Sequence, residues 1–356
     1  MSEGFDFGNT RVRARRADLL DADRYHELAG LDVDRLMAAL SDTPYRPDIE
    51  AATPRHRGVR LLDEALRTNL ARTLRELATW YDGPAGVDVS LLVGRWDLRN
   101  LRAILRGHYA RSSPDEIRAA LVPAGRLGDD VLGELAGQAG LRSAVDLMFT
   151  WGVPSPEVAR AAVGALADLA STGDFQGFER TIERAAAHRL HKSLYEADPE
   201  VAGVLRAEID QINLLTAVRL HQARIGPDDW DPVDPMERFL GGGALPLPML
   251  AGAARAEDRV TAVEMLADAP MPRAWRPALT RWGETGDMVV LGDELDEITA
   301  RVVAGMFGTS DPLGPGMPMA YMWAKENEVK NLRSIGAGAA AGRPADQIEG
   351  ELVILW

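Results

Sequence analysis

One stretch of the sequence occurs three times and constrains the fold more than any other feature. Each copy carries an acid three residues before an Asn-Leu pair. The asparagines are roughly 115 residues apart, which is the scale of a domain and well above the roughly 20 to 50 residues of a solenoid repeat. The sequence therefore indicates one helical unit present three times. The copies are "GRWDLRNLRAILRGHY" (94–109) with Asp97, Asn100 and Leu101, "AEIDQINLLTAVRLHQ" (207–222) with Asp210, Asn213 and Leu214, and "KENEVKNLRSIGAGAA" (325–340) with Glu328, Asn331 and Leu332.

Further landmarks recur at matching distances. A proline follows each asparagine by 13 or 14 positions, and a large apolar residue stands 17 positions after it. The segment Gly125 to Leu127 has a counterpart in Gly243 to Leu245. We therefore expect three similar helical domains at 1–121, 122–238 and 239–356. The landmark residues are Pro114, Pro227 and Pro344, and then Ile117, Trp230 and Ile348.

The spacing of the motif suggests what its polar residues do. On a helix, the acid, the asparagine, the leucine and the residue four beyond the asparagine share one face, so two polar side chains lie in an apolar stripe. A buried acid and amide can bind the loose backbone groups of a neighbouring helix end, each of which would otherwise cost about 1–3 kcal/mol. We favour this packing role over catalysis, because catalysis would need the same site built three times in one chain.

Composition favours an all-α protein. Hydrophobic residues make up 46% of the 356 residues and aromatics only 6%, with Ala, Leu and Arg dominating. The absence of cysteine excludes disulfides, thiolate metal sites and cysteine nucleophiles. A formal net charge of −14 argues against binding to nucleic acid or to an anionic lipid surface. No apolar run approaches the roughly 20 residues of a bilayer span, and the N-terminus lacks a hydrophobic signal core, so we expect a cytoplasmic protein without direct lipid insertion.

Apolar periodicity places long helices before the first two motifs. Leucines recur every three or four positions from Val59 to Tyr81, and the pattern from Asp174 to Ala197 is similar. Each unit is therefore expected to contain a crossing pair of long helices. Near the start, Asn9 or Thr10 is expected to cap a helix. The apolar end "ELVILW" (351–356) is expected to dock into the core.

Three segments could have carried chemistry, and in each we favour a structural interpretation. "GAGAAAGR" (336–343) resembles a phosphate loop but lacks the following Gly-Lys-Ser/Thr, so ATP binding is not expected. His188 and His191 lie one helical turn apart, yet metal bundles draw carboxylates from several helices. The acidic segments 228–234 and 293–297 lack the calcium-loop pattern. We predict no catalytic, cofactor or metal site.

The motifs carry a family resemblance. "RVRARRADLL" near the start, "RWDLRNLRAILR", "IDQINLLTAVR" and "ENEVKNLRSI" together resemble the C subunit of bacterial and archaeal V/A-type rotary ATPases, the counterpart of the eukaryotic d subunit, over the full length and in order. The resemblance implies three helical domains around a pseudo-threefold axis, forming a funnel. One departure is that Arg106 and Arg219, six residues after their asparagines, have Ala337 as the third counterpart.

The resemblance also implies a function, which is that of a non-catalytic rotor part of the central stalk. The foot of the soluble shaft would enter the funnel, whose base would sit on the proteolipid ring at the cytoplasmic face of the membrane. The chain would pass torque between ATP turnover and proton or sodium transport, and would be a monomer when isolated. The alternatives are a helical scaffold that binds an unrelated protein partner and a helical metal-dependent enzyme.

Overall fold

The structure, a computed structural model, describes residues 4–225 and 234–356. The described residues form helices and connecting segments without strands, which confirms the all-α prediction. They divide into two compact units, with unit 1 comprising Met1–Leu147 and Val302–Trp356, and unit 2 comprising Met148–Arg301. The landmarks Pro227 and Trp230, and the acidic segment 228–234 except for its last residue, lie outside the described residues. The division into three domains at 1–121, 122–238 and 239–356 stays a prediction.

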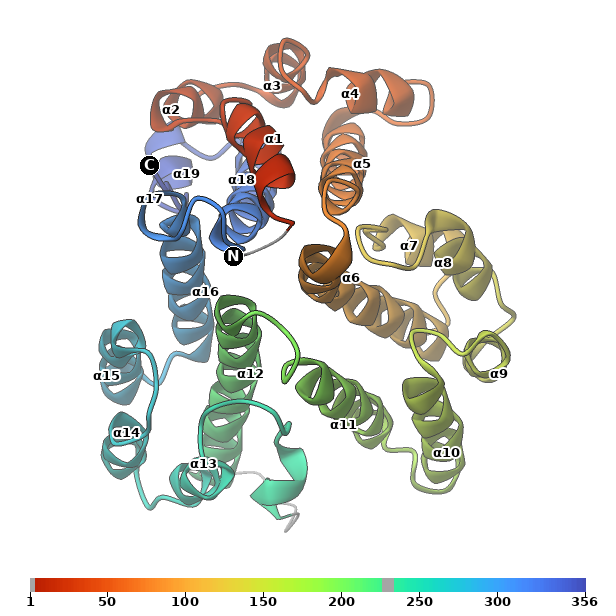
Figure 1. Cartoon of the computed structure of the whole chain (residues 1–356), viewed down its shortest axis with the longest axis vertical. Coiled ribbons are helices and arrows are strands. Elements are labelled where there is room, and N and C mark those ends of the chain that lie inside the picture. Colours follow the sequence, from red (N-terminus) through yellow and green to blue (C-terminus); the bar gives the residue numbers. More distant parts are fainter. Residues whose placement is uncertain (1–3, 226–233) are drawn as a thin grey trace. The chain divides into compact units, whose positions relative to one another are not determined.

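Unit 1 brings the two ends of the sequence together. The long helices α5 and α18 pack against each other, α1 packs against α18, and α19 packs against α2 (Figure 1). On the other side of α5, helix α6 contacts α7 and α8. The helices of this unit are α1 (Asp6–Arg16), α2 (Ala22–Ala29), α3 (Val33–Leu40), α4 (Arg46–Ala52), α5 (Gly58–Ala78), α6 (Gly83–Tyr109), α7 (Pro114–Ala119), α8 (Asp129–Ala136), α17 (Met306–Thr309), α18 (Gly316–Ala340) and α19 (Ala345–Glu349).

Unit 2 contains the second motif on α12, which packs against α13, and the following helices pack in sequence order (Figure 1). Helices α10 and α11 form an antiparallel pair joined through Gly173, whose φ of 72° suits the left-handed turn after α10. The helices are α10 (Pro156–Thr172), α11 (Phe175–Ser193), α12 (Pro199–Ile225), α13 (Leu247–Ala254), α14 (Arg259–Ala267) and α15 (Arg276–Thr285), with short 3-10 helices η1 (Pro235–Arg238) and η2 (Arg273–Trp275); α9 (Leu141–Trp151) and α16 (Met288–Ala304) cross the division between the units.

The long helices expected before the first two motifs are confirmed as α5 and α11. Their caps differ in strength, because Asp174 accepts the backbone N–H of Gly177 at the start of α11, whereas α5 begins without a side-chain cap. Packing therefore supplies most of the stability of α5. Its apolar stripe from Leu62 through Leu66 and Leu70 to Leu74 is almost wholly buried.

The cap predicted near the start of the chain was wrong, whereas the docking predicted for residues 351–356 occurs through Val353. Helix α1 begins at Asp6, and Asn9 is a buried residue inside it rather than a cap. The Asn9 side chain donates to the carbonyls of Pro312 and Gly314 and accepts from the Tyr81 hydroxyl, so a tertiary contact has taken the place of the capping bond. At the other end, only Val353 of the segment 351–356 is buried.

Candidate functional site

The three motif asparagines make the same contact. In each copy, the side-chain amide donates to the carbonyl of one residue outside the helices, and its oxygen accepts the N–H of that same residue. The distances are 2.6 and 2.8 Å for Asn100 with Val122, 2.8 and 2.8 Å for Asn213 with Leu240, and 2.9 and 3.1 Å for Asn331 with Val353. Each partner residue follows the short helix that comes after the motif helix, namely α7, η1 or α19. A buried backbone segment thus has both of its polar groups satisfied by one side chain.

The acids of the first two copies bind a second segment, just before the next helix. Asp97 accepts the N–H groups of Arg126 and Leu127 at 3.1 and 2.9 Å. Asp210 accepts those of Ala244 and Leu245, both at 2.9 Å. Leu127 and Leu245 each stand two residues before a helix, α8 or α13. The predicted pairing of motif polar groups with backbone therefore occurs, but with the segments between helices rather than with helix ends.

A glycine makes room for each of these carboxylates. A Cβ atom on Gly125 would lie 2.1 Å from Asp97 Oδ1, and one on Gly243 would lie 2.0 Å from Asp210 Oδ1. Both distances are far below van der Waals contact, so a side chain at either position would displace the carboxylate. The recurrence of Gly-x-Leu in the sequence thus reflects the space that the acid needs.

Burial governs the ionisation of these two acids. Removal from water raises the pKa of Asp97, although the N–H groups of Leu127 and Arg126 act in the opposite direction. Asp210 shows the same balance, with burial raising its pKa against the N–H groups of Leu245 and Ala244. Each of these buried carboxylates accepts two backbone N–H groups, which suits it to holding a chain segment in place.

The third acid has different partners. Glu328 Oε2 accepts the N–H of Leu20 at 2.7 Å, and Oε1 accepts from the Tyr45 hydroxyl and from Lys325 Nζ, each at 2.7 Å. Leu20 also stands two residues before a helix, α2, so it occupies the place that Leu127 and Leu245 hold in the other copies. The last motif helix therefore holds the beginning of the chain.

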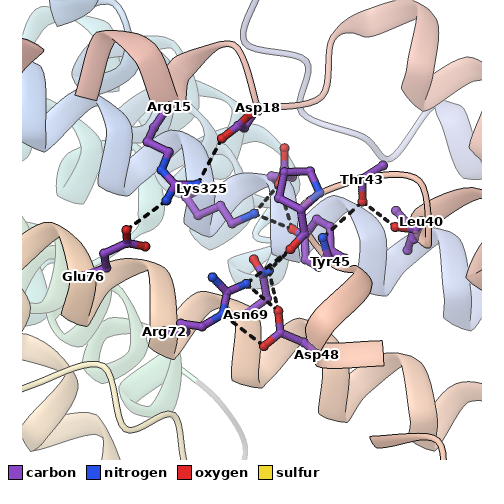
Figure 2. A network of polar contacts seen from close by, with 12 residues as sticks. Arg15, Asp18, Leu40, Thr43, Tyr45, Asp48, Asn69, Arg72, Glu76 and Lys325 are labelled. Carbon is purple, nitrogen blue, oxygen red and sulfur yellow. Dashed lines mark hydrogen bonds and ion pairs between the residues drawn. The ribbon is translucent and has the colours of Figure 1, made fainter. Parts of the chain in front are cut away.

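Tyr45 and Lys325 complete this buried cluster, as Figure 2 shows from close by. Lys325 Nζ donates to the Tyr45 oxygen at 2.9 Å and lies 4.1 Å from the centre of its ring. Burial, and then the charge of Glu328, raise the pKa of Tyr45, so the hydroxyl keeps its proton and donates it. Lys325 is 4% exposed and Glu328 is 1% exposed, which makes this an ion pair almost without solvent.

A second polar cluster lies beside the first and joins α4 to α5 (Figure 2). Asp48 accepts from Asn69 at 2.8 Å and from Arg72 at 2.7 Å, and both donors also reach the carbonyl of Pro44. Since Pro44 directly precedes Tyr45, the two clusters fix adjacent residues of one connecting segment. The start of unit 1 is thereby attached to two of its long helices, α5 and α18.

The remaining motif residues divide into core and surface. The leucines after the asparagines are fully buried, whereas the arginines and the alanine six positions after them are exposed and take no part in the contacts described above. The leucines are Leu101, Leu214 and Leu332, and the exposed residues are Arg106, Arg219 and Ala337. Acid and asparagine thus form the contact site in each copy, with leucine packing beneath them.

Several contributing residues were missed by the sequence analysis. Tyr45 lies outside the motif, and Lys325 opens the third copy at a position where the other copies have Gly94 and Ala207, so only burial identifies the two residues. Leu20 could have been found, because it precedes its helix by the same distance as the leucines of the Gly-x-Leu segments. Its own segment has Asp18 in place of the glycine, which hid the correspondence.

The segments in which the sequence could have placed a phosphate or metal site instead form helix turns and ion pairs. The glycines of 336–343 belong mainly to the last turns of α18. His191 near the end of α11 contacts Tyr195, which follows the helix. Glu294 and Glu297 of α16 pair with Arg281 and Arg301. Within residues 4–225 and 234–356, no group of three or more His, Asp or Glu side chains is placed to hold a metal ion. In the same residues, no helix has both the length and the apolar character needed to cross a membrane.

Comparison with known proteins gives a consistent result along the whole chain. Residues 8–351 match the family model described as ATP synthase (C/AC39) subunit. The C subunit of the A-type ATP synthase of Halorubrum lacusprofundi is 30% identical over 349 residues, covering 97% of this chain and 96% of the relative. The C subunits of the V-type ATP synthases of Deinococcus radiodurans and Thermus thermophilus are 28% and 26% identical, covering 99% of this chain and 92% and 99% of the relatives.

Proposed function

Because the chain belongs to the ATP synthase (C/AC39) subunit family, we propose that it is a non-catalytic central-stalk component of a rotary V/A-type ATPase. In this role it couples the soluble rotor shaft to the proteolipid ring and transmits torque for proton or sodium transport. The observation that carries the proposal is the family match over residues 8–351, together with relatives of matching length that are named as the C subunits of A-type and V-type ATP synthases.

The buried contacts of the motif helices support a mechanical role. Torque transmission needs a body whose helices keep their relative positions under load. Each motif helix is held to connecting segments by at least three hydrogen bonds from buried side chains, and each bond removes an unsatisfied buried backbone group worth about 1–3 kcal/mol. Such contacts resist sliding and rotation of one helix past its neighbours better than apolar packing alone, because hydrogen bonds depend on direction.

We further propose the three-domain funnel as the form in which this protein works, with the shaft entering its wide end and the ring contacting its base. The three equivalent asparagine contacts support a threefold repeat. The protein would be cytoplasmic, bound to the inner membrane face through the ring's polar loops, and a monomer when isolated. Its acidic composition suits contact with protein better than contact with anionic lipid.

Reconstitution tests the proposal directly. ATPase and membrane sectors would be assembled with and without this chain, and ATP hydrolysis and ion transport would be measured together. We expect hydrolysis to continue without the chain while transport stops, and transport to return when the chain is added. Equal coupling with and without the chain would refute the proposal.

Binding measurements separate this function from that of a scaffold for an unrelated partner. The purified chain would be mixed with shaft subunits, with the proteolipid ring in detergent, and with both. We expect a ternary complex that contains shaft and ring only when this chain is present. Failure to bind either component, with the chain folded by circular dichroism, would favour the scaffold.

A further inference from the structure

Within the residues that the structure describes, a buried histidine of unit 2 has no hydrogen-bond partner for either of its ring nitrogens. His221 lies near the end of α12, is 0% exposed, and neither Nδ1 nor Nε2 has a partner within the described part of the chain. Its ring meets that of Trp282 on α15 edge to face, with centroids 5.9 Å apart. The indole N–H of Trp282 is also without a partner among the described residues. Two polar rings thus share one apolar core, where each unsatisfied polar atom is costly.

The first motif helix provides a direct comparison. His108 stands eight positions after Asn100, as His221 stands eight positions after Asn213. Both are buried, but His108 Nε2 lies 2.8 Å from the carbonyl of Leu135 on α8. Helix α6 ends directly after His108, whereas α12 continues to Ile225 and carries Arg224, whose guanidinium donates to the carbonyls of Arg255 and Ala256. The same motif position is therefore satisfied in one copy and unsatisfied in the other.

The surroundings of His221 oppose a positive charge. Burial lowers its pKa below the ordinary 6.5, and Arg224 on the same helix and Arg259 on α14 act in the same direction. Asp258, the N-cap of α14, acts against them but is the only acid that does so among the groups acting on this ring. A protonated imidazole would have two N–H donors, and neither ring nitrogen has an acceptor in the part of the chain that the structure describes, so the charged ring would have to leave its place in the core.

We infer that His221 is an acid-sensitive contact in unit 2, and that its protonation expels the ring from the core and loosens the packing of α12 against α15. The direction in which stability changes with pH follows from the lowered pKa of His221. The stability that the neutral ring contributes is fully present above about pH 6.5 and is lost as the pH falls through the depressed pKa of the folded state. Each pKa unit of depression corresponds to about a tenfold change in the unfolding equilibrium constant.

A matched pair of variants tests this inference on the full chain. His221→Phe keeps an aromatic ring of similar size and removes both unsatisfied nitrogens. Wild type, His221→Phe and His108→Phe would be unfolded in urea at pH 7.5 and pH 5.5, with hydrogen exchange of α12 and α15 followed at both values. We expect wild type to lose stability and exchange protection of α12 and α15 at pH 5.5, and His221→Phe to keep both. His108→Phe should have a lower free energy of unfolding than wild type at pH 7.5, because its contact with Leu135 is lost. Between pH 7.5 and pH 5.5 it should lose as much further stability as wild type does.

If His221→Phe lost as much stability between pH 7.5 and pH 5.5 as wild type does, the inference would be overturned. Because a substituted core may fail to fold, the imidazole resonance of His221 would also be titrated by NMR in the unmodified chain. Titration of this resonance at or above pH 6.5, or titration below 6.5 with no change in exchange at α12 and α15, would overturn the inference as well.

Discussion

The first and third motif copies both lie in unit 1, yet their acids hold very different parts of the chain. Asp97 accepts two N–H groups of a segment 29 and 30 residues later. Glu328 accepts the N–H of Leu20, 308 residues earlier in the sequence. The first contact could form while the neighbouring chain folds, whereas the third requires both ends of the chain to be present. The same motif thus fixes a local connection in one place and closes the unit in the other.

The difference in distance along the chain accompanies a difference in chemistry. Asp97 is bound only by backbone N–H groups, and a glycine gives it room. Glu328 reaches one carbon further, tolerates Asp18 at the position matching that glycine, and uses its second oxygen for Tyr45 and Lys325. Bringing two distant chain segments together costs more loop-closure entropy than a local contact. The closing contact has correspondingly more and stronger partners, since one of them is charged.

The largest expected effect comes from neutralising the third acid. Glu328→Gln leaves the ammonium of Lys325 buried without its counter-ion, and we expect a loss of about 3–5 kcal/mol in the free energy of unfolding. Asp97→Asn is the matched change in the first copy. It sets an amide group against a backbone N–H, so it should cost only about 1–3 kcal/mol. Urea unfolding of the two variants would measure both values.

The double variant Glu328→Gln/Lys325→Met identifies the origin of that loss. If the unpaired ammonium is responsible, removing both charges should recover a large part of the stability that Glu328→Gln alone loses. A double variant as unstable as Glu328→Gln alone would mean that the Leu20 and Tyr45 contacts matter more than the ion pair.

The next largest effect distinguishes the asparagines. Asn100→Ala leaves the N–H of Val122 unsatisfied between α7 and α8, where the segment is fixed at both ends, while the Val122 carbonyl keeps the N–H of Ala124. The variant should cost about 1–3 kcal/mol. Asn331→Ala removes the partner of the Val353 N–H, but the Val353 carbonyl keeps the side-chain amide of Asn327, and the N–H lies in the last few residues, where it can bond to water instead. The expected loss of stability is therefore smaller, but residues 351–356 should become more sensitive to carboxypeptidase. Equal losses and equal protease resistance in the two variants would contradict this difference between the copies.

The sequence predicted the common part of this arrangement and not the part that differs. Spacing alone placed Asp97, Asn100 and Leu101 and their counterparts on one buried helix face, because helical periodicity is a local property. It could not identify Tyr45, which lies outside the repeat, or Lys325, whose counterparts at the start of the other two copies are Gly94 and Ala207. The contact between Tyr45 and Lys325 joins residues far apart in sequence. The cap expected at Asn9 failed for the same reason, since carbonyls about 300 residues away compete for its amide.

A smaller effect tests the space beside the acid. Gly125→Ala places a methyl group on the Asp97 carboxylate, and we expect a loss of about 1–3 kcal/mol in unfolding free energy from the displaced bonds. Gly94→Ala is the control, because a Cβ there meets nothing within 4 Å and the residue lies inside α6. It should stabilise the chain by about 0.5–1 kcal/mol. If Gly125→Ala behaved like Gly94→Ala, the first acid would not need its glycine, and the contrast with Glu328 would be lost.

The smallest effect concerns how α19 is held to the start of the chain. His26 Nδ1 on α2 lies 2.9 Å from Glu349 Oε2, but the two side chains are 58% and 32% exposed. An exposed pair of this kind contributes about 0.2–1 kcal/mol at most, so His26→Ala should lower the urea midpoint only slightly. Asn331→Ala should lower it more, because the bonds that it removes are buried. If His26→Ala had the larger effect, α19 would depend on its surface contact with α2, and the motif would not be what holds the two ends of the chain together.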